Sequence, residues 1–165
     1  MTIEKKNPNA TTVTASSNAI TEINDRINAE ETANHGHSTF VLSGSSDTLT
    51  EAEFWDGGII TLTESSPAPS SAFTLNVPAN KRGIVNFVNA TTAEVTITIS
   101  GQSATAPTLP PKSTHASLTG LPGQEASLRC DATNVRWAGI PSFAMSAAEY
   151  AALSTVDARA EYITL

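Results

Sequence analysis

Residues 95–99 alternate strictly between apolar side chains and threonine. Because successive side chains of a strand point to opposite faces, this spacing predicts a strand that buries Val95, Ile97 and Ile99 and leaves the threonines at solvent or an interface. The strand closes the most regular part of the chain, FTLNVPANKRGIVNFVNATTAEVTITISG (residues 73–101), in which turns break three apolar runs. This stretch has no histidine or cysteine and one acid, Glu94. The best-patterned residues therefore predict a scaffold rather than a reactive site.

Further strands are expected around this stretch, because the chain is charge-poor and about a quarter of its residues are serine or threonine. The runs with strand character are FVLSG (40–44), GIITLTE (58–64), FTLNVPA (73–79), GIVNFVNA (83–90), EVTITIS (94–100), HASLTGL (115–121), EASLRC (125–130) and VRWAG (135–139). The turns between them are short, and one holds the basic pair Lys81-Arg82, which we place at a hairpin tip. We predict an all-β fold, an antiparallel β-sandwich or jelly-roll-like domain over residues 38–142.

The two ends of the chain have a different pattern. Residues 1–16 have no period and are expected to form an arm that orders only on a partner. A helix over about 18–33 would carry Ile20, Ile23 and Ile27 on one stripe, which favours a trimer over a dimer. We therefore treat residues 1–37 as an attachment and oligomerisation segment.

The C-terminal segment, residues 143–165, is expected to form a short helix and then a strand. Ser146 and Glu149 form a capping-box pattern that opens a helix over about 147–154. Residues 161–165 read as a strand-like end, docked on the domain or on a neighbour. Thr50 and Glu53 have the same capping spacing and predict one further helical turn.

Charge and composition exclude several classes of partner. The net charge is −7 and no segment is basic, so nucleic acid is not an expected target. No apolar run approaches the roughly 18–20 residues that span a bilayer, and MTIEKKNPNATTV lacks the apolar core of a signal peptide. Cys130 is the only cysteine, so no intrachain disulfide forms. We expect a soluble protein made in a reducing cytoplasm.

Four stretches together resemble proteins of tailed-bacteriophage virions: LTEAEFWDGGIITLTE, FTLNVPANKRGIVNFVNAT, SLRCDATNVRWAG and MSAAEYAALSTVDARAEYITL. The resemblance covers about residues 47–165 and implies a β-module with a strand-turn-strand hairpin, of the kind found in short head or tail fibres and minor structural proteins. It implies no catalytic motif. The chain has no long fibre shaft, which favours a decoration, adaptor or spike-base role.

The acids Glu51, Glu53 and Asp56 are the closest carboxylate group and the formal candidate for a hydrolase or cation site. We interpret them as a solvated helix start followed by a turn. His35 and His37 lie one residue apart, so a trimer would bring six imidazoles together. Histidines at a helix end are ordinary, and we predict no metal site, leaving metal binding in an oligomer open.

The remaining candidates are interpreted as structural. Cys130 is expected to be a buried, inert thiol, and His115 has no catalytic partner in a recognisable context. Trp55 and Trp137 would suit a sugar-stacking platform but are expected to close the core. The triplets at Asn9 and Asn89 match the glycosylation pattern and are interpreted as turns.

The sequence therefore predicts a structural protein of a tailed-phage virion that is not an enzyme and uses no cofactor. The partners expected are further copies of itself in a homotrimer and other capsid, neck or tail proteins. The alternative hypothesis is a carbohydrate-binding module that recognises a host surface glycan from the same particle. A glycan hydrolase is the third class.

Overall fold

The computed structural model describes four ranges of the chain: 21–24, 37–54, 56–66 and 72–165. The chain divides into two compact units, residues 1–36 and residues 37–165. No helix in the described ranges is long and apolar enough to cross a membrane.

Only a short part of the first unit is described. Residues 21–24 are helical, as the sequence predicted, and Ile23 is 53% exposed. Ile20, Ile27 and the arm 1–16 lie outside the described residues, so the isoleucine stripe and the role of the arm stay predictions.

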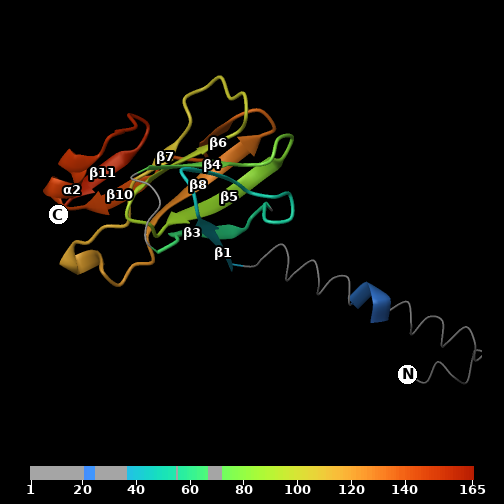
Figure 1. Cartoon of the computed structure of the whole chain (residues 1–165), viewed down its shortest axis with the longest axis horizontal. Coiled ribbons are helices and arrows are strands. Elements are labelled where there is room, and N and C mark those ends of the chain that lie inside the picture. Colours follow the sequence, from blue (N-terminus) through green and yellow to red (C-terminus); the bar gives the residue numbers. More distant parts are fainter. Residues whose placement is uncertain (1–20, 25–36, 55, 67–71) are drawn as a thin grey trace, which may run out of the picture. The chain divides into compact units, whose positions relative to one another are not determined.

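The second unit contains three sheets, and the first six strands alternate between the two larger ones (Figure 1). The five-stranded sheet contains, in spatial order, β1 (His37–Leu42), β3 (Ile59–Glu64), β5 (Arg82–Asn89), β8 (Gln124–Asp131) and β9 (Val135–Trp137). The four-stranded sheet contains β2 (Ser46–Thr48), β4 (Ala72–Asn76), β6 (Glu94–Thr98) and β7 (Thr108–Leu109). From β1 to β6, each strand therefore lies in the sheet opposite to the strand before it.

This alternation makes the neighbouring strands of each sheet parallel. His37 in β1 lies opposite Ile59 in β3, so one circuit of both sheets takes 22 residues, and Ile59 lies opposite Asn86 in β5. In the other sheet, β2 pairs with β4 and β4 with β6 in the same parallel sense. Parallel strands cannot be joined by a tight turn. The strand in the opposite sheet supplies the return path here.

The all-β class is confirmed, but the purely antiparallel sandwich or jelly-roll-like arrangement is not, because the sheets are mixed. Within the described residues, antiparallel pairing is confined to β5–β8, β8–β9 and β6–β7. The hairpin predicted around Lys81 and Arg82 is wrong, since β4 and β5 lie in different sheets. A short polar turn has the same composition whether it joins two paired strands or crosses to a facing sheet, and the sequence could not separate the two.

Most predicted strands exist, with shifted ends, and one does not. HASLTGL contains a 3-10 turn, η2 (Ala116–Leu118), in which the Nδ1 of His115 accepts the amide of Ser117 at 3.3 Å. The residues after Thr50 form a turn rather than a helix, although Glu53 Oε2 does accept the Thr50 amide at 2.7 Å. Strands β2 and β7 were missed because two or three residues are too short to show a period.

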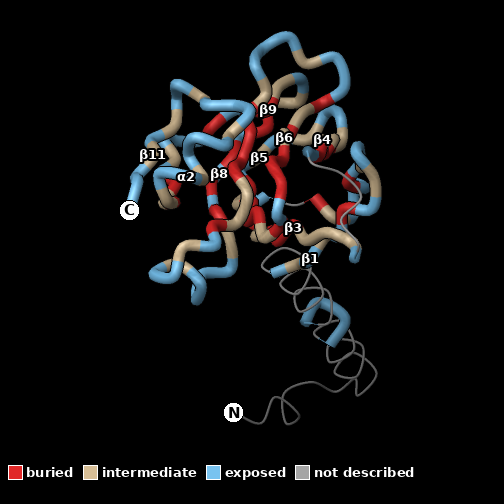
Figure 2. The backbone as a smooth tube through the Cα atoms, turned by 60° about the vertical axis from the view of Figure 1, so that its left-hand side comes forward, coloured by how far each residue is buried: buried red, intermediate tan, exposed pale blue. Residues whose placement is uncertain are grey.

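The facing side chains of both sheets share one apolar core. In β6, Val95 and Ile97 are fully buried and Ile99 follows them, whereas Thr96 and Thr98 are half-buried on the other face, as the alternation predicted. Figure 2 shows that buried residues concentrate on the strands and exposed residues on the projecting loops. The scaffold interpretation of this stretch thus matches its place in the core.

The C-terminal residues form the third sheet, which has two strands. Strand β10 (Ser142–Met145), which the sequence did not predict, pairs in parallel with β11 (Glu161–Thr164). Helix α2 (Ala147–Ala152) connects them and opens with the predicted capping box of Ser146 and Glu149. Phe143 and Met145 are buried in the common core, so this sheet belongs to the same body as the two larger sheets.

Asn89 at the end of β5 is the most heavily bonded polar side chain of the interior. It is fully buried, and its Nδ2 donates to the carbonyls of Ala93 at 2.9 Å and Pro110 at 2.8 Å, with Leu109 at 3.3 Å. Its Oδ1 accepts the amide of Thr91 at 3.0 Å. One side chain of the five-stranded sheet thus holds the chain where it enters β6 and leaves β7. The Asn-Ala-Thr triplet is a structural element, and its asparagine is not accessible for glycosylation.

We expect Asn89→Asp to destabilise the second unit by roughly 3–5 kcal/mol, several times the cost of one unsatisfied buried polar group. A carboxylate would place acceptor oxygens against carbonyls that need a donor. Denaturant unfolding, followed by the fluorescence of the two tryptophans, measures the loss.

Asn86→Asp is the matched control, because Asn86 lies three residues away on the outer face and accepts a hydrogen bond from Ser127 that aspartate also accepts. A change in unfolding free energy of equal size in both variants would show that Asn89 has no special role.

Candidate functional site

The three acids considered as a hydrolase or cation site, Glu51, Glu53 and Asp56, each bind a different partner. Glu51 forms an exposed ion pair with Lys81 at 3.4 Å. Glu53 binds Thr50, and the Oδ1 of Asp56 accepts the amide of Ile84 at 2.6 Å. These contacts give the carboxylates structural roles at the turn before β3 and the start of β5.

The histidine pair is only partly described. His35 lies outside the described residues, so the hypothesis of a metal site in an oligomer stays open. The Nε2 of His37 lies 2.7 Å from the hydroxyl of Thr61 on the neighbouring strand. Within the described residues, no three potential ligands gather in a way that would hold a metal ion.

Trp137 and Cys130 lie in the core, as the sequence predicted. The indole of Trp137 packs edge-on against Phe143, with centroids 5.9 Å apart, and donates to Asp157 Oδ2 at 2.8 Å. Burial, followed by the charge of Asp131, raises the pKa of the Cys130 thiol to about 12, so it is not a nucleophile at neutral pH. Trp55 lies outside the described residues.

Three acidic side chains fasten the C-terminal segment to the sheets. Glu94, buried at the start of β6, accepts the amide and the hydroxyl of Ser154, at 2.5 and 2.7 Å. Glu149 accepts the hydroxyl of Ser113 at 2.8 Å and the amide of Thr114 at 2.7 Å. The third, Asp157, accepts a hydrogen bond from the indole N–H of Trp137. The acids therefore connect segments far apart in the chain.

The electrostatics of two of these acids show how strongly the folded state favours their charge. Partial burial acts to raise the pKa of Glu149, but hydrogen bonds from Ser146, Thr114 and Ser113 outweigh it and lower the pKa to about 2. For Asp157, the hydrogen bond from the Arg159 side chain is the largest cause, and the pKa is also about 2. Both groups are charged over the whole neutral range.

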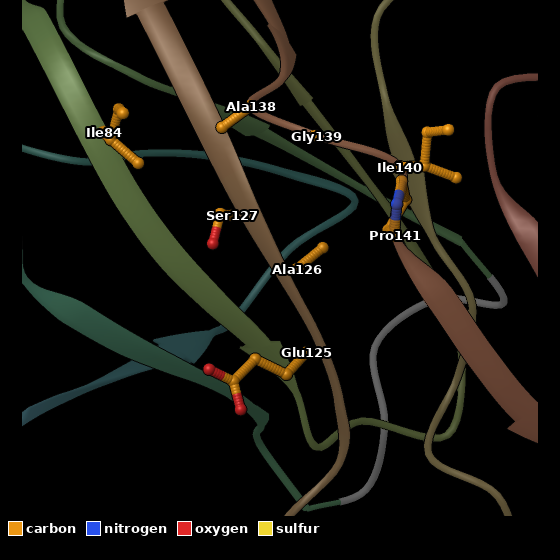
Figure 3. A pocket seen from close by; sticks show the side chains of 8 residues that line it. All are labelled: Ile84, Glu125, Ala126, Ser127, Ala138, Gly139, Ile140 and Pro141. Atoms are coloured by element: carbon orange, nitrogen blue, oxygen red, sulfur yellow. The ribbon is translucent and has the colours of Figure 1, made fainter.

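Two adjoining hollows lie on the outer face of the five-stranded sheet. A groove of about 440 Å³ is framed by Ile84 on β5, by β8 along its floor, and by residues 138–141 on the other side (Figure 3). A second hollow of about 360 Å³ adjoins it at Ile84 and is lined by Arg82, Arg129 and Arg136 together with acids. Sequence reasoning missed both, because their residues come from strands whose pairing was unknown.

Several large apolar side chains are exposed on the second unit. Ile140 at the groove is 80% exposed, and Val41 on the edge strand β1 is 53% exposed. Ile163 and Leu165 are exposed on and just after β11, at 46% and 53%. These side chains are available for contacts with other proteins, and single exposed apolar side chains are also ordinary on a protein surface.

In comparisons with known proteins, no family model, no curated protein and no solved structure matches this chain.

The lowered pKa values predict that the protein loses stability in acid. A group whose pKa is lower in the folded state stabilises that state above its unfolded pKa, here 4.5 for Glu149 and 3.8 for Asp157. This contribution is lost as the pH falls towards about 2. The free energy of unfolding should therefore decrease between about pH 5 and pH 2.

The double variant E149Q/D157N should be less stable at pH 7 and should show a flatter decrease in acid, because two of the responsible groups no longer titrate. Glu125→Gln is the control, since Glu125 is exposed and its carboxylate makes no hydrogen bond or ion pair with other described residues. An unchanged slope in the double variant would contradict the assignment.

Proposed function

We propose that this protein is a structural component of a tailed-phage virion, a short fibre, decoration or adaptor protein that attaches to the particle through residues 1–37. It would act as a homotrimer and present residues 38–165 as a rigid, sandwich-like body. The resemblance of residues 47–165 to virion proteins is the starting point of this proposal.

The use of the carboxylates is the observation that carries the proposal. Glu94, Glu149 and Asp157 are bound to amides, hydroxyls, an indole and a guanidinium of the same chain. Groups held in this way rigidify the fold and are not poised to exchange protons with a substrate at neutral pH. These three acids therefore connect segments of the chain to one another.

The exposed surface supports assembly as a second, separate observation. Apolar side chains such as Ile140 and Val41 remain open on a body with a well-formed core of its own. A net charge of −7 over 165 residues does not prevent such contacts, because only 15% of the residues are charged.

We expect the protein to be found in purified particles of the phage that encodes it. Mass spectrometry of capsids separated from tails would detect it in one fraction and assign its position. Deletion of residues 1–16 should abolish incorporation while leaving the unfolding midpoint of the second unit nearly unchanged. Absence of the full chain from both fractions would contradict the proposal.

We expect the full chain to form a trimer in solution. Ile23→Asn should lower the trimer fraction measured by light scattering at micromolar concentration, because it removes an exposed apolar side chain from the predicted seam. Glu22→Gln, on the neighbouring position, is the control and should leave the trimer intact. A monomeric wild-type chain would rule out the seam.

A further inference from the structure

Strand pairing brings three arginines together on the outer face of the five-stranded sheet. Arg129 in β8 lies directly opposite Arg136 in β9, and on its other side it lies opposite Ile84 in β5. Arg82, two residues before Ile84, is on the same face because strand side chains repeat every second residue. Three of the five arginines in the sequence therefore lie within two rows of one sheet corner.

This arrangement costs stability unless something neutralises it. Like charges directly opposite each other in a sheet are destabilising. Arg136 has a partner, Asp131, at 3.4 Å, but the guanidinium groups of Arg82 and Arg129 make no hydrogen bond or ion pair within the described part of the chain. In a protein of net charge −7, two unpaired guanidiniums beside a third mark a local site for an anion.

The two acids of the hollow are already committed to the backbone. Asp56 Oδ1 accepts the amide of Ile84 at 2.6 Å, and Gly83 leaves the space in which that carboxylate packs. Asp131 accepts the amide of Asn134 at 2.9 Å in the turn after β8, and this hydrogen bond is the largest cause that lowers its pKa. Both carboxylates therefore hold the hollow in shape, and three guanidiniums against two carboxylates leave its lining with a formal charge of +1.

The size and lining of the hollow indicate what kind of anion fits. About 360 Å³ lies at the lower end of the range typical of small-molecule sites. Guanidinium donors, carboxylate acceptors and the apolar face of Ile84 line it together. A sugar ring offers the complementary set, with hydroxyls that both donate and accept and an apolar C–H face, and an acidic substituent would pair with Arg82 and Arg129.

We propose that the hollow lined by Arg82, Arg129 and Arg136 binds an anionic saccharide, through a carboxylate or phosphate group on the sugar. The guanidinium of Arg129, between the other two strands, makes the central bidentate contact, and Ile84 contacts the ring. Trp137 does not line this hollow, and the site does not depend on the assembly role proposed above.

Titration of the full chain with glucuronate and with glucose 6-phosphate, at low salt, tests the site. Amide chemical shifts in NMR spectra should change around Ile84, Arg129 and Arg136 for both sugars. Glucose and inorganic phosphate distinguish the contributions: each alone should bind more weakly than the anionic sugar, because each offers only half of the contacts.

Arg129→Gln should weaken binding by about tenfold or more, the value of a hydrogen bond to a charged group. Arg129→Lys keeps the positive charge but loses the planar guanidinium that makes two hydrogen bonds. Its affinity should lie between that of the wild type and that of Arg129→Gln. Lys112→Gln removes one positive charge elsewhere and should leave affinity unchanged, with unfolding midpoints showing that every variant is folded.

Several results would overturn the inference. Equal binding of glucose would show that the anion is not recognised, and equal binding of inorganic phosphate would show that the sugar is not. Tight binding of an acidic peptide in place of both sugars would assign the hollow to a protein partner. Loss of sugar binding would leave virion incorporation untouched, so the two proposals fail separately.

Discussion

The side-chain amide of Asn89 is the contact on which the two-sheet body depends. It stands at the end of β5 and binds the carbonyls of the chain that enters β6 and leaves β7. Asn89 is fully buried, and only the carbonyl of Ala93 has a further side-chain donor among the described residues, the hydroxyl of Thr91 at 2.9 Å. Gly123 packs against the carbonyl of the same residue, where any side chain would overlap backbone atoms. The parallel winding of the first six strands ends here, and the antiparallel pairs begin.

The C-terminal segment is also held by buried or partly buried polar side chains, and here they are charged. Glu94, Glu149 and Asp157 each connect the C-terminal segment, residues 142–165, to a distant part of the chain. The segment is therefore held to the sheets by directional bonds as well as by Phe143 and Met145 in the core. Gln102 does the same at the free edge of β9, where its side chain pairs with both the amide and the carbonyl of Val135. Polar side chains thus complete the edges of a body built of short strands. On the outer face of the five-stranded sheet, the side chains of Arg82, Arg129 and Glu125 make no ion pair with other described residues.

The sequence could predict part of the candidate sites and not the rest. The burial of Cys130 followed from its place at the end of an alternating run, and that of Trp137 from its place at a strand edge beside Gly139. The arginine-lined hollow had no signal in the sequence, since Arg82 and Arg129 are 47 positions apart and face the same side only because β5 pairs with β8 in one register. The three fastening acids were equally hidden, apart from the capping spacing of Glu149 with Ser146. Contacts across long separations need the pairing of strands, which local pattern does not contain.

The sequence by itself determined the all-β class, the buried face of residues 95–99 and the capped helix near the C-terminus. Each of these rests on side chains a few positions apart, where period and capping chemistry act directly. The tertiary structure decided which strands are neighbours, and so made the sheets mixed and carried the residues around Lys81 from one sheet to the other. The physical reason is that a turn specifies only that the chain reverses. The partner of each strand is chosen by burial of both sheet faces in one core and by the polar groups, Asn89 first, that must find bonds inside it.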